Sequence, residues 1–403
     1  MRPELLDSTL PFDQAVARTM AAVRPIVRAD TVKLDEAVGR VAAADVTSAI
    51  DVPPFDRSAM DGFALRSADV LTANVEPVRL RCMGQVLTGA LYTDVVTPGQ
   101  CVEIATGAPV PTGADAVVMV ERTSRELDTI LVHEPVSAGQ NIGRRGADIQ
   151  RGHSVVGRGD YITPARAGAV AAVGLTRLSV FAKPSVAILS TGPEVAGPGN
   201  TPGPGQIHDV NTTTLAAVVM LHGGEARVMP AVDDVVEDLA AALISAAANN
   251  DVVVCSGGTS VGRRDVLTDA LALCGRMVFH GIAVKPGKPT LLGYVGDTPL
   301  FGMPGNPTSC LSNAYLLLVP FLRATARLPE WQPRRIRAPL ARTIRSNAGR
   351  HQFYTVRLES GQVVPAFKSS GDITSMAGAD GYIEIPADIS TIEAGENVTV
   401  TLF

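Results

Sequence analysis

Two loops combine a stiff backbone with groups that could bind an anion. The segment KPGKP at 285–289 holds Lys285 and Lys288 between prolines and a glycine. Because proline fixes the backbone angle φ, this loop would hold its two positive charges more firmly than a helix face would. The segment SGGTSVGRRD at 256–265 carries Gly257 and Gly258, whose amides could approach an anion where a helix begins. The loops predict a site for phosphate or another oxyanion, although each one alone could be an ordinary surface turn.

Two further loops follow strand-like runs in the same part of the chain. STGPE at 190–194 comes after VAILS, and MPGNP at 303–307 comes after PLFGM. In MPGNP we expect Asn306 to cap a helix and Pro307 to take its first position. Loops that leave neighbouring strands at one edge of a sheet are harder to explain as unrelated turns. We therefore expect the glycine loops to contribute to one site.

Acidic side chains lie beside these loops or in similar ones. A hard cation such as Mg²⁺ needs such oxygens to bridge carboxylates and phosphate. A lone acid in a loop is more often a turn former or a helix cap, which is the alternative for Asp234 and Asp265. The acids in question are Asp61, Asp148, Glu194, Asp209, Asp233, Asp234 and Asp265.

The elements that must position these loops alternate between strands and helices from residue 184 onward. Aliphatic runs such as VAILS and DVVVCS alternate with helices predicted at 211–221, 234–248, from 265, and at 307–325. This pattern predicts an α/β fold with a mostly parallel sheet covered by helices on both faces. In such a sheet the ligand site lies where strand ends meet helix starts.

The rest of the chain does not show this regular alternation of strands and helices. Helical spacing predicts helices at 12–28 and 34–44, with Pro25 near the end of the first. Short β-branched runs broken by Pro and Gly predict small β-domains. We expect a β-rich domain at 51–143, the α/β domain at 181–328 and a C-terminal β-domain at 333–403.

The composition and the missing signatures exclude several classes of protein. The 403 residues carry a net charge of −5 without a basic run, which argues against binding to nucleic acid or a membrane surface. The longest apolar stretch, at 314–322, is too short to span a bilayer. Five scattered cysteines without C-x-x-C spacing predict free thiols in a reducing cytoplasm. The sequence lacks the Walker A, dinucleotide, zinc and G-x-S-x-G signatures.

A series of motifs resembles one known family. In chain order they are SAMDGFA, ATGAPVPTGADAVVMVE, STG-x-E, IHDVN, SGGTSVG-x-x-D, KPGKP and MPGNP. Their order and spacing resemble the molybdopterin molybdenumtransferase family, MoeA, which includes the E domain of gephyrin in animals. The resemblance runs from about residue 10 to the C-terminus, and so many ordered motifs are very specific.

The resemblance implies a fold, an activity and an assembly. Family members have a linker region built from two segments, a β-rich domain, a MogA-like α/β domain and a C-terminal domain like a small β-barrel. In this chain the resemblance implies that the N-terminal helix and linker region take up residues 8–50 and 144–180. They insert molybdate into adenylylated molybdopterin in the last step of molybdenum cofactor synthesis, releasing AMP with Mg²⁺ present. We therefore expect a cytoplasmic homodimer that binds adenylylated molybdopterin and molybdate, with acids of one subunit facing the α/β domain of the other.

The resemblance also assigns roles to individual residues. The acids would polarise the phosphoanhydride, the lysines would neutralise molybdate and phosphate charge, and the amides of Gly257 and Gly258 would position the pterin phosphate or the nucleotide. The catalytic set would be Asp61, Asp148, Glu194, Asp233, Asp265, Lys285 and Lys288, of which Glu194, Asp233 and Asp265 would hold Mg²⁺. The substrate-binding set would be Thr106, Ser190, Thr191, Gly192, Ser256, Gly257, Gly258, Ser260, Pro304, Gly305 and Asn306.

Two departures from the family pattern keep other functions open. The family's G-E-D-I segment has Ala147 in place of the glutamate, and its TG-[DN]-E loop has Pro193 in place of the polar residue. These changes motivate an alternative in which the chain is mainly a dimeric, gephyrin-like scaffold that binds another protein. A third hypothesis is an adenylyltransferase of the MogA type, although the four-region layout argues against it.

Overall fold

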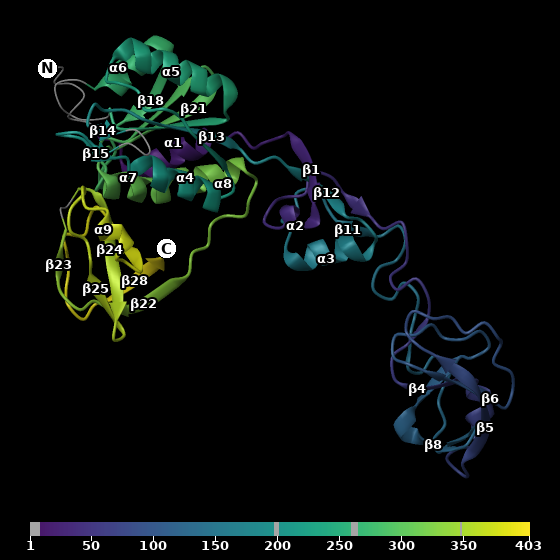
Figure 1. The fold of residues 1–403 in the computed structure, drawn as a ribbon. Helices are drawn as coiled ribbons and strands as arrows, with labels where there is room; N and C mark the ends of the chain where they lie inside the picture. The colour runs from purple at the N-terminus through teal and green to yellow at the C-terminus, as the bar shows by residue number, and fades with distance from the viewer. Residues whose placement is uncertain (1–8, 197–200, 259–264, 347–348) are drawn as a thin grey trace. The chain divides into compact units, whose positions relative to one another are not determined.

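The contacts within the chain divide it into two compact units, each of which is described by itself. The computed structural model describes residues 9–196, 201–258, 265–346 and 349–403. Unit 1 holds the N-terminal segment up to Asp30, residues 39–41 and residues 181–403. Unit 2 holds residues 31–38 and 42–180. Figure 1 shows the elements of both units.

Unit 1 is built on a six-stranded sheet. In spatial order its strands are β16 (Glu225–Val228), β13 (Ser185–Ser190), β17 (Val252–Ser256), β21 (Thr298–Met303), β20 (Leu291–Val295) and β18 (Gly275–His280). The first four strands are parallel, whereas β20 and β18 are antiparallel to their neighbours. The reversal at β20 and β21 follows from a tight hairpin in which Gly296 has a φ of 57°. The prediction of a mostly parallel sheet is confirmed, since β20 alone of these six strands runs in the opposite direction.

Helices cover both faces of this sheet. Successive strand residues point to opposite faces, so Val186 and Ile188 join one hydrophobic cluster while Ala187 and Leu189 join another. Figure 1 shows α5 and α6 on one side of the sheet and α4, α7 and α8 on the other. These helices are α4 (Asn211–Leu221), α5 (Val236–Asn249), α6 (Val266–Cys274), α7 (Pro307–Asn313) and α8 (Val319–Thr325).

Two predicted helices are shorter in the structure. The helix expected at 12–28 is α1 (Phe12–Ala21), because Pro25 has no N–H with which to continue the helical hydrogen bonds. The helix expected at 34–44 is α2 (Leu34–Ala37), and it stops before Gly39, whose φ is 82°. The helix expected at 307–325 runs the whole distance but contains a π-helical turn at Ala314–Leu318 between α7 and α8.

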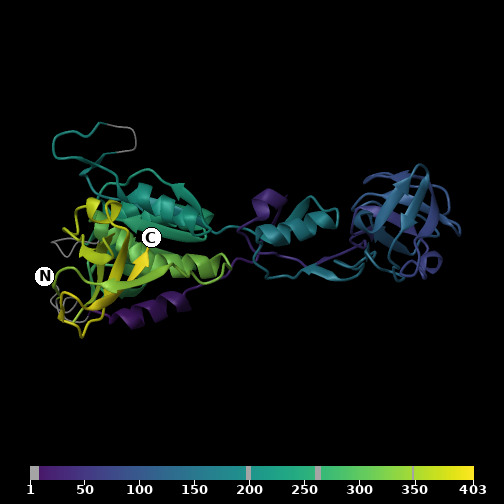
Figure 2. The same ribbon diagram turned by 90° about the horizontal axis from the view of Figure 1, so that it is seen from below.

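A second six-stranded sheet forms the C-terminal part of unit 1. Its strands are β19 (Val284–Lys285), β24 (His351–Glu359), β26 (Gly381–Ile385), β28 (Asn397–Leu402) and β22 (Arg335–Pro339), with β25 (Gln362–Pro365) paired to β24. Figure 2 shows its yellow strands from a second side, together with helix α1. The short strand β19 begins the KPGKP loop and pairs with β24, so this loop is anchored on the C-terminal sheet. Smaller elements nearby are β23 (Ile344–Arg345), α9 (Thr374–Ala377) and β27 (Thr391–Ile392).

Unit 2 contains the β-rich sheet and a small helical part. The sheet order is β7 (Ala116–Met119), β4 (Gly62–Leu65), β6 (Gln100–Ile104), β5 (Val78–Val86), β9 (Thr129–Val132) and β8 (Thr123–Glu126). A separate hydrophobic cluster, which includes Val156, Ile162 and Val170, supports the helical part. Shorter elements are β1 (Ala29–Lys33), β2 (Val46–Thr47), β3 (Arg57–Ser58), β10 (Ile142–Gly143), β11 (Ser154–Val156), α3 (Pro164–Ala172) and β12 (Arg177–Phe181). Within the described ranges of both units, no helix has the length and apolar character needed to cross a membrane.

Candidate functional site

The ends of three parallel strands bring the glycine loops to one edge of the unit 1 sheet. Ser190 at the end of β13 is in register with Ser256 at the end of β17, and Ser256 is in register with Met303 at the end of β21. The STGPE, SGG and MPGNP loops therefore leave the sheet side by side, as the sequence predicts. The order of the strands, which the sequence does not contain, makes these loops neighbours.

A small pocket of about 60 Å³ lies at this edge. The residues that were predicted for the site and line the pocket are Ser190, Thr191, Glu194, Ser256, Gly257 and Gly305. His208, Asp209 and Asn211, from the segment that leads into α4, complete the polar part of the wall. The pocket thus combines hydroxyl groups with the two carboxylates of Glu194 and Asp209. The hydroxyl groups can bind polar atoms of a ligand, whereas a phosphate would approach the two carboxylates only with a bridging cation.

Asn211, which is not among the predicted site residues, holds the loops together. It is the first residue of α4 and is only 9% exposed. Its Nδ2 donates to Ser256 Oγ at 2.7 Å and to the carbonyl of Gly305 at 2.8 Å. Its buried Oδ1 has no hydrogen-bond partner in the described part of the chain. The signal that could have identified Asn211 was its place in the IHDVN motif.

The SGG loop packs directly against the STGPE loop. Gly257 has a φ of 95°, and a Cβ there would lie 2.3 Å from the carbonyl oxygen of Thr191. Its N–H donates to the carbonyl of Met303 at 3.2 Å, which continues the pairing of β17 with β21. The expectation that the Gly257 amide positions a phosphate is therefore corrected, since the sheet already uses this donor. The glycine is required by the close approach of two loops.

Asp233 and Asp234 come directly after Val232, which forms an isolated β-bridge with Thr191. Only one of these two acids contacts the STGPE loop. Thr191 Oγ1 donates to Asp234 Oδ1 at 2.5 Å. Asp233 is exposed, and no described residue hydrogen-bonds to its side chain. The structure thus ties Asp234 to the site edge, whereas the role assigned to Asp233 stays a prediction. In the same loop Glu194 folds back over Gly192, whose lack of a Cβ makes room for the carboxylate.

Asp265 caps a helix and also faces a histidine. Its Oδ1 accepts a hydrogen bond from the amide of Thr268 at 3.0 Å, which is the N-cap geometry for α6. Its Oδ2 lies 3.2 Å from Nε2 of His280 at the end of β18. The sequence offered no signal for His280, because the pair forms between elements that the fold brings together. Ser260, predicted in the loop just before Asp265, lies outside the described residues.

The predicted magnesium ligands are not gathered into one group. Among the residues that the structure describes, no three of His, Cys, Asp and Glu come together as a metal-binding set. The assignment of Mg²⁺ to Glu194, Asp233 and Asp265 therefore stays a prediction. The donors in the pocket do fit Mg²⁺ chemically, because this ion commonly keeps several waters and takes one or two carboxylates plus substrate phosphate oxygens. Glu194 and Asp209 could supply those carboxylates.

The KPGKP loop lies beside a pocket rich in positive charge. Asn313 of α7 fixes the loop by donating from Nδ2 to the carbonyl of Gly287 at 2.9 Å. Lys285 lines a pocket of about 220 Å³ together with Arg345 and Lys368. Three cations around one small volume favour a doubly charged oxyanion. Arg345 and Lys368 belong to no motif and lie more than fifty residues further along the chain, so no local pattern predicts that they join this pocket.

The MPGNP loop fulfils one of the two expectations for the start of helix α7. Pro307 takes the first position of α7, as predicted. Asn306 stands at the N-cap position, but its side chain makes no capping hydrogen bond. Its Nδ2 instead donates to Ser370 Oγ at 3.0 Å, so it joins this loop to the C-terminal part of unit 1. Pro304 is buried at the base of the same loop.

In unit 2 the structure brings two predicted site residues together. The amide of Thr106 donates to Asp61 Oδ1 at 2.7 Å, and the Asp61 side chain is exposed. The next residue must be glycine, because a Cβ at Gly62 would lie 1.9 Å from the carbonyl oxygen of Val118. The SAMDG and ATGAP motifs therefore form one local structure.

Asp148 lies in a loop that Asp51 holds in place. The amide of Asp148 donates to the carbonyl of Val52 at 3.0 Å. Asp51 accepts hydrogen bonds from the amide of Arg151 at 2.9 Å and from Nε of Arg145 at 2.7 Å. These two partners, the amide first, lower the pKa of Asp51. The Asp148 side chain is left exposed at the surface of the loop.

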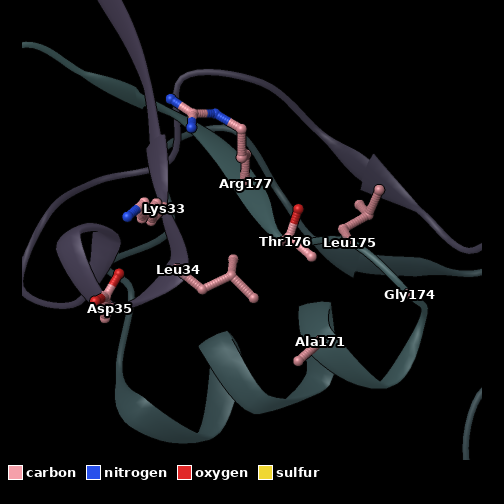
Figure 3. A pocket seen from close by; sticks show the side chains of 8 residues that line it. All are labelled: Lys33, Leu34, Asp35, Ala171, Gly174, Leu175, Thr176 and Arg177. Carbon is pink, nitrogen blue, oxygen red and sulfur yellow. The ribbon is translucent and has the colours of Figure 1, made fainter.

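A larger pocket in unit 2 contains none of the predicted site residues. It measures about 570 Å³ and lies beside α3. Figure 3 shows its side chains, which combine the apolar Leu34 and Leu175 with the positive charges of Lys33 and Arg177. The pocket therefore adds no group to the predicted site.

Three family models match consecutive parts of the chain. They are the MoeA N-terminal region (domain I and II) at residues 10–174, a probable molybdopterin binding domain at 187–324 and the MoeA C-terminal region (domain IV) at 337–403. These three matches together extend over most of the chain.

Named relatives and solved structures match the full length. A protein of Mycobacterium tuberculosis named molybdopterin molybdenumtransferase 2 is 35% identical over 404 residues, which is 98% of each chain. The molybdopterin molybdenumtransferase of Synechococcus elongatus is 34% identical and covers 97% of this chain and 99% of its own. Two structures described as molybdopterin biosynthesis MoeA proteins of Pyrococcus horikoshii have TM-scores of 0.85 and 0.82, at 38% and 31% identity. Each covers 98% of this chain, and the matches take in 99% and 100% of those chains.

Proposed function

The chain belongs to the MoeA family, and from this premise we propose that it is a molybdopterin molybdenumtransferase. Its reaction would insert molybdate into adenylylated molybdopterin and release AMP. The observation that carries the proposal is the sheet edge in unit 1, where three loops and Asn211 enclose a polar pocket with two carboxylates. The full-length relatives, named as molybdopterin molybdenumtransferases, support the same activity.

The two pockets of unit 1 would divide the binding of the substrates. The pocket with Lys285, Arg345 and Lys368 would neutralise the two charges of molybdate. The pocket at the sheet edge would hold a phosphate-bearing part of adenylylated molybdopterin through hydroxyl groups such as those of Ser190 and Ser256. A bound Mg²⁺, held there by carboxylates such as Glu194, would supply charge stabilisation for the phosphoanhydride.

Other assigned residues remain part of the proposal. Asp265, held by the Thr268 amide, would be a fixed carboxylate near the start of α6. Lys288 would add a second positive charge from the KPGKP loop. Asp61, Thr106 and Asp148 would supply the contribution of unit 2, and the Thr106 amide already orients the Asp61 carboxylate.

The decisive test measures AMP release from adenylylated molybdopterin on addition of molybdate and Mg²⁺. We expect D265N to lower the rate by about a hundredfold or more, because an uncharged amide cannot replace the carboxylate beside the phosphoanhydride. D269N is the matched control, since Asp269 is an acid in the first turn of the same helix with no role in the proposed site, and its rate should stay that of the wild type. Unchanged AMP release by D265N would exclude the role given to Asp265. A wild type that releases no AMP but binds another protein would favour the scaffold instead.

We also propose that the protein is a cytoplasmic homodimer. Helix α4 exposes Met220 and Leu221 by 61% and 74%, which is apolar surface that a second copy could cover. All five cysteines are free, which suits a reducing compartment. Light scattering should report twice the chain mass of 42.0 kDa, and a monomer at micromolar concentration would contradict the dimer.

A further inference from the structure

Two cysteines of the β-rich sheet lie side by side on neighbouring strands of unit 2. Cys82 of β5 and Cys101 of β6 are register partners in a parallel pair. Registered partners on adjacent strands have Cα atoms roughly 4.8 Å apart, within the range over which a disulfide can form. Both side chains pack in the same hydrophobic cluster. The structure holds them as free thiols.

The two thiols differ in their exposure to solvent. Cys101 is fully buried, and burial raises its pKa to about 12, with Cys82 adding to the shift through its charge and a side-chain hydrogen bond. Their shared register and their shared hydrophobic cluster make the two thiols neighbours on one face of the sheet. Cys82 is partly exposed and also contacts the carbonyl of Gly84 at 3.5 Å. A small oxidant in solution therefore meets Cys82 first and finds Cys101 directly behind it.

A positive charge lies beside this pair. The guanidinium of Arg125 interacts electrostatically with both thiols, and Nη1 donates to Glu103 Oε2 at 2.7 Å. Glu103 belongs to β6, the strand of Cys101, so this ion pair holds Arg125 at the thiol pair.

We propose that Cys82 and Cys101 are a reversible redox pair that closes into an intrachain disulfide when the protein meets a hydroperoxide. The Cys82 thiolate attacks the terminal oxygen of the peroxide, the O–O bond breaks, and hydroxide or alkoxide leaves while Cys82 becomes a sulfenic acid. The sulfur of Cys101 then attacks the sulfur of Cys82, the S–O bond breaks, and the oxygen leaves as water with the proton of Cys101. Two electrons pass from the thiol pair to the peroxide, and a dithiol reductant restores both thiols.

The disulfide would join two strands that lead to the Asp61 site. Beyond the cysteines, β5 and β6 stay paired through Val86 and Ile104, and the chain then reaches Thr106. Thr88 Oγ1 donates to the carbonyl of Thr106 at 2.9 Å, so the segment after β5 also touches this residue. Cross-linking the strands would restrict the unfolded chain and stabilise the sheet that carries Thr106.

The test uses the full-length reduced protein and hydrogen peroxide as the probe. We expect loss of two titratable thiols, loss of two hydrogen atoms in mass, and one cross-linked peptide pair that contains Cys82 and Cys101. Dithiothreitol should reverse all three changes. In C101A the sulfenic acid at Cys82 should persist and react with dimedone, whereas C274S is the matched control and should form the disulfide like the wild type, because Cys274 is a partly exposed thiol on a helix.

Thermal unfolding supplies a second readout that does not depend on catalysis. Oxidation should raise the Tm of the β-rich sheet by about 5 °C or more in the wild type and not in C82S. The proposal would be overturned if peroxide oxidised Cys82 in the wild type and no disulfide to Cys101 formed. The same holds if peroxide reacts with Cys82 no faster than with Cys274. If C101A does not fold, the wild-type peptide map and C82S still decide the question.

Discussion

At the scale of single residues, His222 shows how an ionisable group becomes part of a hydrophobic core. It is 3% exposed, and neither ring nitrogen has a hydrogen-bond partner in the described ranges. Its ring packs edge-on against Tyr315 and Trp331. Burial, and to a smaller extent the charge of Arg323, lowers the pKa of His222 from 6.5 to about 4. The folded protein therefore keeps this histidine neutral at pH values where the unfolded chain protonates it.

This shift predicts a loss of stability in acid. Between about pH 6.5 and pH 4 the unfolded chain binds one more proton than the folded protein, so the free energy of unfolding falls as the pH falls. The loss from pH 7 to pH 5 should be about 2 kcal/mol. Urea unfolding can be followed by the fluorescence of Trp331, which is the only tryptophan and contacts the His222 ring.

The variant H222F tests the origin of this pH dependence. Phenylalanine keeps an aromatic ring in the cluster and cannot be protonated, so the stability of H222F should change less between pH 7 and pH 5. H208F is the matched control, because His208 is exposed in the same unit, and it should retain the wild-type dependence. An equal acid loss in H222F and the wild type would show that other groups cause it.

At the scale of elements, the site depends on how closely one loop approaches another. The SGG loop can cross the STGPE loop only because Gly257 has a positive φ and no Cβ. G257A should therefore lower the free energy of unfolding by about 2 kcal/mol or more and also displace Thr191, reducing AMP release. Chemical denaturation and the AMP assay on the same preparation measure both effects.

The control for G257A is a glycine at which an added Cβ would meet no other atom. Gly168 lies inside helix α3, and a Cβ there would meet nothing within 4 Å. G168A should raise stability by about 0.5–1 kcal/mol, because alanine loses less backbone entropy than glycine in a helix. G257A with wild-type stability would mean that the loop can relax away from Thr191.

At the scale of the whole molecule, the chain leaves unit 1 and returns to it at neighbouring points. The amide of Ala182 donates to the carbonyl of Arg28 at 3.0 Å. The two chain ends that border residues 31–180 are therefore adjacent within unit 1. Unit 1 also contains its own hydrophobic clusters on both faces of its sheet. These features indicate that unit 1 can fold without unit 2.

Deleting residues 31–180 and joining the ends with a short glycine linker tests this independence. We expect cooperative unfolding, reported by Trp331, and molybdate binding within about threefold of the full chain, since the pocket of Lys285, Arg345 and Lys368 is retained. AMP release should be lost, because Asp61, Thr106 and Asp148 are removed. A shortened chain that unfolds without a cooperative transition would show that unit 2 is needed to stabilise unit 1.

The sequence by itself determined the local elements and the loops that matter. Alternating aliphatic runs and helices predict the α/β sheet, and the helix expected at 211–221 is α4 with those bounds. The glycine and proline motifs mark loops at the ends of β13, β17 and β21. Periodicity and backbone restrictions are properties of a few consecutive residues, which is why they can be read without a structure. The two-segment linker region and the site roles rest on the resemblance, and they remain predictions together with the domain bounds.

Only the tertiary structure decided which side chains meet. It pairs Thr191 with Asp234 and not with the neighbouring Asp233, and it places His280 against Asp265. It also adds Arg345 and Lys368 to the pocket of Lys285, and it sets Cys82 beside Cys101. Each of these contacts depends on strand order, on register or on the direction in which a loop turns. Those features arise from packing between segments far apart in the chain, so no local pattern of residues contains them.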